Sequence, residues 1–142
     1  MKKIRFIIDS DLENVALVGM SIKKLCSLTP FSENQSFQIE LCVVEAINNS
    51  IIHAYNGLSI YEVEVILSIN MDHLMIEVCD TGKPMDDEVL LDANFKPFDD
   101  GIDNLDKISE SGRGLGLIKE LMDKVSYRSD DAGNRLTLLK YY

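Results

Sequence analysis

Residues 41–55 read Leu-Cys-Val-Val-Glu-Ala-Ile-Asn-Asn-Ser-Ile-Ile-His-Ala-Tyr, and their pattern is that of an unusually apolar helix. Within it Glu45, Asn49 and His53 recur every four residues, which places them on one face. A carboxylate and an amide would be costly to bury there without partners. The face is therefore either a solvated polar stripe or the wall of a pocket. In a pocket, the Asn49 oxygen would suit magnesium and the Glu45 carboxylate would suit proton transfer.

The surrounding chain alternates helical and strand patterns. A capping-box pattern at 10–13 precedes apolar residues at helical spacing, and residues 61–69 alternate as in a half-buried strand. The expected elements are a strand at 3–8, helices at 11–27 and 35–55, strands at 61–69 and 74–79, a helix from 115 to 124, and strands at 125–129 and 135–141. This order predicts an α+β fold: a two-layer sandwich with a mixed or antiparallel sheet and about three helices on one face.

A second unusual place is Asp80-Thr81-Gly82-Lys83-Pro84, which directly follows an apolar strand. Asp, Gly and Pro are common in ordinary turns, so a plain turn is one interpretation. In the other, the Asp80 carboxylate at the strand end accepts a hydrogen bond from an exocyclic amine such as that of adenine. Gly82 would then let the backbone approach the base closely.

A third unusual place is Ser111-Gly112-Arg113-Gly114-Leu115-Gly116-Leu117, at the start of the expected third helix. Alternating glycines expose backbone N–H groups next to a helix N-terminus, a combination that binds phosphate, and Arg113 could add charged donors. A glycine-rich hinge is the other interpretation. The spacing does not fit a dinucleotide-binding fingerprint, and no Gly-Lys-Ser/Thr closes a P-loop.

Composition limits the classes of function. The 142 residues suit a single domain, expected to span 1–142, and the net charge of −10 argues against direct binding to nucleic acid or anionic membranes. No stretch approaches the length of a membrane span, and no secretory signal is expected. The three cysteines, Cys26, Cys42 and Cys79, are far apart, which indicates reduced core thiols in a cytoplasmic protein.

Taken in order, the three unusual places resemble the nucleotide-binding boxes of the GHKL, or Bergerat-fold, ATPases. Residues 45–49 resemble the E-x-x-x-N box, 80–82 the D-x-G box and 112–116 the G-x-G-x-G box. The longer string Glu-Ala-x-x-Asn-x-x-x-His-Ala-Tyr at 45–55 is most similar to the bacterial anti-sigma factor serine/threonine kinases. The resemblance covers nearly the whole chain.

The resemblance implies a kinase that uses ATP and magnesium. Glu45 would act as general base, Asn49 would coordinate magnesium, Asp80 would hold the adenine amine, and residues 85–111 would form the ATP lid. That segment holds nine acids against two lysines, a charge that would repel a triphosphate unless the acids face outward. The implied ATP-binding residues are Asn49, His53, Asp80, Gly82, Gly112, Arg113, Gly114, Leu115 and Gly116.

The family also suggests partners. The substrate would be an anti-anti-sigma protein, a sigma factor would be sequestered, and the chain could form a homodimer. Two alternatives stay open: a nucleotide-gated binding module with little catalysis, and a detached histidine-kinase catalytic domain. The second needs a dimerisation helix pair with an acceptor histidine, whereas the chain has just His53, in the pocket helix, and His73, in a turn.

Overall fold

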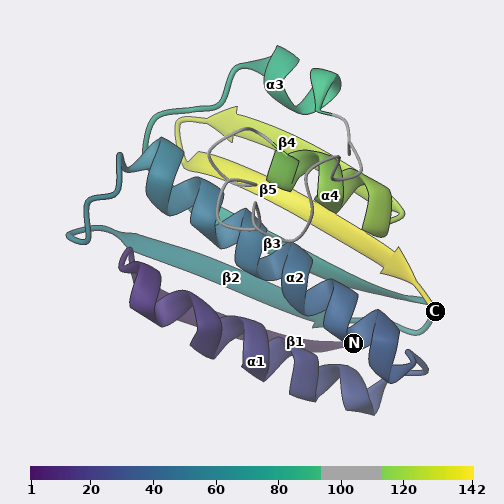
Figure 1. The fold of residues 1–142 in the computed structure, drawn as a ribbon. Coiled ribbons are helices and arrows are strands. Elements are labelled where there is room, and N and C mark those ends of the chain that lie inside the picture. Colours follow the sequence, from purple (N-terminus) through teal and green to yellow (C-terminus); the bar gives the residue numbers. More distant parts are fainter. Residues whose placement is uncertain (94–112) are drawn as a thin grey trace, which may run out of the picture.

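The computed structural model describes residues 1–93 and 113–142, with Arg113 described in its backbone alone. All strand pairs are antiparallel, and the sheet order is β1-β2-β3-β5-β4. The strands are β1 (Lys2–Asp9), β2 (Glu62–Ile69), β3 (His73–Asp80), β4 (Lys124–Asp130) and β5 (Gly133–Tyr141). The helices are α1 (Val15–Leu25), α2 (Glu33–Asn49), α3 (Asp87–Asp92) and α4 (Arg113–Leu121). The predicted α+β sandwich is confirmed, with α1, α2 and α4 on one face of the sheet (Figure 1).

The core lies between the sheet and this helical layer. In β2, Val63, Val65 and Leu67 are fully buried beneath the helices, while on the other face Glu64 is partly exposed and Ile66 and Ser68 are buried. The alternation is clearest at the start of the strand. Such alternation is typical of an antiparallel sheet with one covered face. Helix α2 lies between α1 and α4 and contacts both, which explains its apolar sequence (Figure 1).

The start of the first helix differs from its prediction. Ser10 does not form a capping box: its hydroxyl donates to the carbonyl of Leu58 at 2.5 Å and accepts from the Tyr61 N–H. Asp11 instead caps a short 3-10 turn, η1 (Leu12–Asn14), which precedes α1. A complete capping box occurs at α2, where Ser32 and Gln35 exchange side-chain and backbone hydrogen bonds. That box was not predicted, and the predicted start of α2 at residue 35 is two residues late.

Three short elements were not predicted as such. The first long helix ends in a 3-10 turn, η2 (Cys26–Leu28), and Thr29 then adopts an extended backbone, so the break expected before Pro30 is confirmed. The second ends in a π-helical turn, η3 (Ser50–Ala54), closed by a hydrogen bond from Tyr55 N–H to Ser50 O. Helix α3 lies in a segment where no regular structure was expected, and residues 94–111 of the predicted lid lie outside the described residues.

The cysteine prediction holds for two of the three residues. All three are free thiols, but only Cys26 and Cys42 are buried in the core. Cys79 is partly exposed on the uncovered face of the sheet, where it borders a shallow cavity. Within the described ranges, none of the helices has the length and apolar character that crossing a membrane requires.

The buried thiols should resist alkylation. Burial raises the pKa of Cys26 to about 11 and that of Cys42 to about 12, so neither forms thiolate at pH 8. We expect iodoacetamide at pH 8 to leave both unmodified in native protein, to label Cys79 first, and to label all three in denaturant. Mass spectrometry of peptides checks this, and native labelling of Cys42 at the rate of Cys79 would contradict it.

Candidate functional site

A pocket of about 430 Å³ lies between the end of α2, the end of β3, the segment leading into α3 and the start of α4. Its volume falls within the roughly 300–1,000 Å³ typical of small-molecule sites. Four of the predicted site residues line it: Asn49, His53, Asp80 and Leu115. They come from three separate segments of sequence, and the fold brings them to one cavity.

Apolar side chains form much of the remaining wall. They are Ala46, Ile52, Val78, Met85, Val89, Leu115 and Leu136. Apolar walls with a few polar groups at defined places are the usual construction of a small-molecule site. Asp80, the predicted acceptor of an amine, is one of the residues that line this pocket.

Asn49 is the polar group that the fold leaves unsatisfied. Its Nδ2 atom is buried and has no hydrogen-bond partner among the described residues. An orphaned buried donor costs about 1–3 kcal/mol, so such groups call for an explanation. A pocket residue with an unsatisfied N–H donor is suited to donate a hydrogen bond to an acceptor atom of a ligand there.

Glu45 lies one turn before Asn49 and packs under the glycine box. A Cβ atom added at Gly114 would stand 2.5 Å from Glu45 Oε2, so any other residue at that position would displace the end of the Glu45 side chain. Glu45 does not itself line the pocket. The carboxylate therefore lies behind the pocket wall, next to the first turn of α4.

The glycine box is partly helical. Helix α4 begins at Arg113, two residues earlier than predicted, so Gly114, Leu115 and Gly116 occupy its first turn and are buried. Leu115 reaches the pocket wall. Gly112 and the side chain of Arg113 lie outside what the structure describes.

The loop after β3 is fixed to the end of α2. The Lys83 N–H donates to Ala54 O at 2.9 Å, and Gly82 packs against that same carbonyl group. A Cβ at Gly82 would collide with the carbonyl oxygen and lie 2.6 Å from its carbon. Gly82 therefore permits a close approach between two protein segments, and it does not line the pocket.

Tyr55 reinforces the same junction. Its hydroxyl accepts from the Thr81 N–H at 2.9 Å and donates to the Glu62 carbonyl at 2.7 Å, which ties α2 to both β2 and β3. The ring is buried and stacks on Tyr61 at 4.7 Å between centroids. Tyr55, which ends the 45–55 string, thus has a structural role.

Two further residues that sequence reasoning missed position the site. Tyr127, from β4, lines the pocket and accepts a hydrogen bond from the Met85 N–H at 2.9 Å, and its burial raises the pKa of its phenol. Asn134, from β5, donates to Asp80 Oδ1 at 2.7 Å. Both partners are more than forty residues away in sequence, so no local spacing could have identified these pairs.

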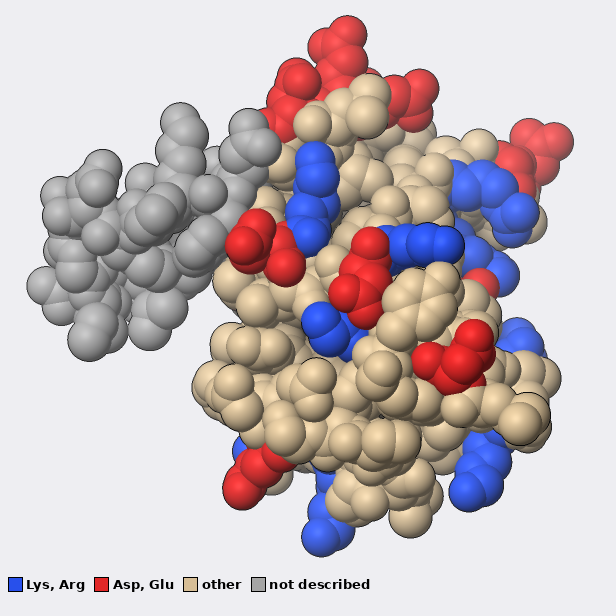
Figure 2. Space-filling view, turned by 90° about the vertical axis from the view of Figure 1, so that its right-hand side faces the viewer, with Lys and Arg blue, Asp and Glu red and all other residues tan. Residues whose placement is uncertain are grey.

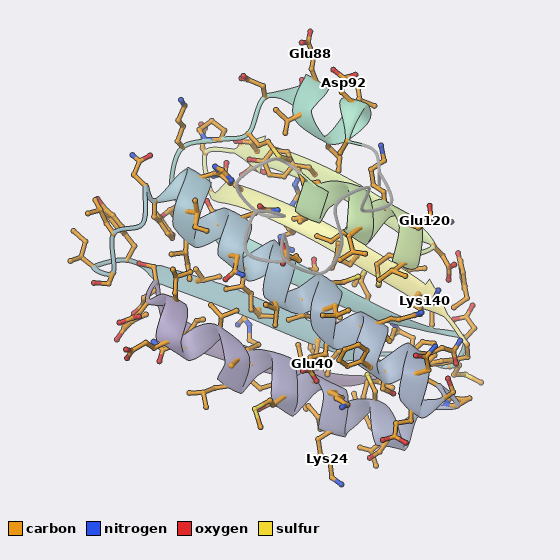
Figure 3. All side chains as sticks on the ribbon, in the orientation of Figure 1. Lys24, Glu40, Glu88, Asp92, Glu120 and Lys140 are labelled. Carbon is orange, nitrogen blue, oxygen red and sulfur yellow. The ribbon has the colours of Figure 1, made fainter. Side chains whose placement is uncertain are left out.

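The acids next to the pocket are directed outward. Asp87, Glu88 and Asp92 of α3 are exposed and do not line the cavity, whereas Asp86 does. Figure 3 shows Glu88 and Asp92 pointing away from the sheet, and Figure 2 shows acidic side chains gathered at the end of the molecule that α3 occupies. In the described part of the acidic segment, residues 85–93, most carboxylates thus face solvent and not the pocket.

A second hollow, of about 410 Å³, lies on the uncovered face of the sheet. Charged side chains on that face pair with one another: Arg5 with Glu64 at 2.7 Å, and Arg135 with Glu77 at 2.8 Å. Asp80 and Asn134 border this hollow as well, but it contains none of the other predicted site residues that the structure describes, so we place the functional site in the pocket on the helical side.

The chain is similar to known proteins over nearly its whole length. Residues 8–140 match the family model described as a histidine kinase-like ATPase domain. The serine-protein kinase RsbW of Listeria monocytogenes is 32% identical over 139 residues, which span 98% of this chain and 87% of that protein. The RsbW of Staphylococcus epidermidis is 29% identical over 130 residues, or 91% and 80% of the two chains.

Among solved structures, a chain in the crystal structure of the SiaB-SiaC complex from Pseudomonas aeruginosa has the same fold. The TM-score is 0.58 at 12% identity, and the match covers 98% of this chain and 89% of that one. At this identity the likeness extends to the fold alone.

The contact at Gly82 should be sensitive to one methyl group. We expect Gly82→Ala to lower the free energy of unfolding by about 1–3 kcal/mol, because the added Cβ must push α2 away from β3. The matched control is Gly57→Asn: Gly57 has φ +74° and no atom within 4 Å of an added Cβ, and asparagine tolerates this backbone. Urea unfolding measures both, and equal losses in the two variants would contradict the packing role.

Proposed function

This chain belongs to the family of histidine kinase-like ATPase domains, and from that premise we propose that the pocket between α2, β3 and α4 binds ATP with Mg²⁺. It is a protein serine/threonine kinase, the class of relatives that are 30 and 32% identical over nearly its whole length. The observation that carries the proposed site is that Asn49, Asp80 and Leu115, from three different segments, line one cavity.

Each part of the pocket has a proposed task. Asp80 accepts a hydrogen bond from the adenine amine, and the apolar walls enclose the base. The first turn of α4, with Gly114 and Gly116, faces the phosphates with its N–H groups, together with Gly112 and Arg113. Residues 85–111 form the lid, and His53 contributes to the rim of the pocket.

The chemistry of the donors suits magnesium. No cluster of three or more His, Cys, Asp or Glu residues able to hold a metal occurs in residues 1–93 and 113–142. Mg²⁺ is commonly bound by few protein ligands together with substrate phosphates, and Asn49 offers one amide oxygen at the pocket wall. When bound, the ion would neutralise charge on the phosphates.

Phosphoryl transfer depends on positioning and on charge neutralisation more than on covalent chemistry by the enzyme. Glu45 is proposed as the base that accepts the proton of the attacking hydroxyl. In the structure its carboxylate lies against Gly114, behind the pocket wall. This placement favours one alternative function, a nucleotide-gated binding module in which Glu45 contributes little to catalysis.

The partners are proposed from the family. The substrate is a serine or threonine of an anti-anti-sigma protein, which acts as the antagonist of the kinase. The kinase also captures a sigma factor, and the sigma factor stays captured when the antagonist is phosphorylated. A homodimer is the proposed assembly. Three unpaired thiols fit a reducing compartment, so we place the protein in the cytoplasm.

Nucleotide binding should depend on Asn49. We expect Asn49→Ala to weaken ATP binding about 10- to 100-fold in the presence of Mg²⁺. The affinity of this variant for ATP should then differ little between buffers with and without Mg²⁺. Asn48→Ala is the matched control, since it removes the same group from the neighbouring residue, which does not line the pocket. Titration calorimetry measures both, and wild-type protein that gives no heat with ATP would refute the proposed site.

The role of Glu45 separates the two candidate functions. If Glu45 is the base, Glu45→Gln should bind ATP like the wild type but transfer labelled phosphate to a purified antagonist protein about 10²- to 10⁴-fold more slowly. Transfer at the wild-type rate would remove Glu45 from catalysis. A wild type that binds ATP and the antagonist but transfers no label would support the binding module.

A further inference from the structure

We infer that Asn134 is a positioning residue that holds the Asp80 carboxylate in place and thereby sets the preference for a purine with an amine at position 6. The inference rests on the proposed function, in which Asp80 faces the base. It starts from a polar side chain that is 5% exposed yet lies outside the wall of the nucleotide pocket.

The hydrogen bonds of Asn134 use its whole amide group. Nδ2 donates to Asp80 Oδ1 at 2.7 Å and to the Gly82 carbonyl at 3.0 Å, while Oδ1 accepts from the Ser129 hydroxyl at 2.7 Å. A carboxylate and a carbonyl can only accept, so the NH₂ group must face them. Ser129 then supplies the donor that the amide oxygen needs, and the network is complete.

This network acts on one particular oxygen of Asp80. Oδ1 accepts from Asn134 and also from the Gly82 N–H at 3.0 Å. Among the described residues, no hydrogen bond falls on the other oxygen, Oδ2. Two donors on Oδ1 fix the plane of the carboxylate and leave Oδ2 to accept from a ligand.

The turn before β5 is built to bring Asn134 to this position. Asn134 is directly opposite Asp80 in the β3–β5 register. The preceding residue, Gly133, has φ +121°, and a Cβ there would stand 2.6 Å from Asp80 O. Position 133 therefore requires glycine for two reasons, the positive φ and the close approach to Asp80 O. This glycine in turn lets Asn134 lie against Asp80.

A fixed acceptor discriminates between purines at position 6. Adenine presents an N–H donor there, whereas hypoxanthine and guanine present a carbonyl oxygen that would face Oδ2 with a second acceptor. Sites built around a specific hydrogen bond reject analogues that cannot make it. If the carboxylate could rotate freely, it could turn away from the carbonyl, and much of the discrimination would be lost.

The test compares the affinities of ATP and inosine triphosphate, which has a carbonyl in place of the 6-amine. Titration calorimetry gives both dissociation constants for the wild type, Asn134→Leu and Ser129→Ala. We expect the preference for ATP to fall about tenfold or more in Asn134→Leu, the loss expected for a hydrogen bond to a charged group, and by a smaller factor in Ser129→Ala. Ser126→Ala, another exposed serine of β4, is the control and should keep the wild-type preference.

The outcomes separate this inference from the proposed function. Equal weakening of both nucleotides in Asn134→Leu, with the ratio unchanged, would mean a structural role and would overturn the inference. Failure of the wild type to bind ATP would instead overturn the proposed function. Should Asn134→Leu fail to fold, as judged by circular dichroism, the ratio in Ser129→Ala decides, and a wild-type ratio there overturns the inference.

Discussion

The junction between the end of α2 and the loop after β3 is the contact on which the site depends. Gly82 lies against the Ala54 carbonyl group, the Lys83 N–H donates to the same carbonyl, and the Tyr55 hydroxyl accepts from Thr81. Asn49 and Asp80 stand on opposite sides of this junction. Because both segments are fixed there, backbone contacts hold Asn49 and Asp80 in place relative to each other.

An irregular helix end makes the junction possible. In η3 the Tyr55 N–H bonds to Ser50 O, five residues back, which widens the last turn of the helix. Ala54 O, near the end of the turn, can then accept from Lys83. Single π-helical turns are often found at functional sites. A second contact of the same kind occurs at Gly114, where the missing side chain lets α4 rest on Glu45.

The sequence predicted what depends on local periodicity and failed where distant contacts decide. Alternation in β2 and the helical spacing in α1 were enough for the fold class, and the motif spacing found Asn49 and Asp80. The capping box at Ser10 was wrong because the Ser10 hydroxyl bonds to Leu58, 48 residues away. Asn134 and Tyr127 were missed for the same reason. Asn134 donates to residues 54 and 52 positions away in the sequence, and Tyr127 accepts from a residue 42 positions away. Gly82 was predicted to lie beneath the base, but it does not line the pocket and packs against the Ala54 carbonyl at the end of η3.

The charge of the chain does not oppose an anionic ligand as strongly as its net value suggests. The Lys119 ammonium donates to the carbonyls of Leu90 and Leu91 at 2.9 and 3.2 Å, at the C-terminal end of α3, where a cation is favourable. This contact ties α3 to α4, and the helix presents Glu88 and Asp92 to solvent (Figure 3). Solvent and salt screen charges that are exposed to water, so these acids repel an anionic ligand less than buried acids would. In the described part of the chain, the charged residues that line the pocket are Lys83, Asp80 and Asp86, one cation and two anions, so the local charge is far closer to neutral than the total of −10.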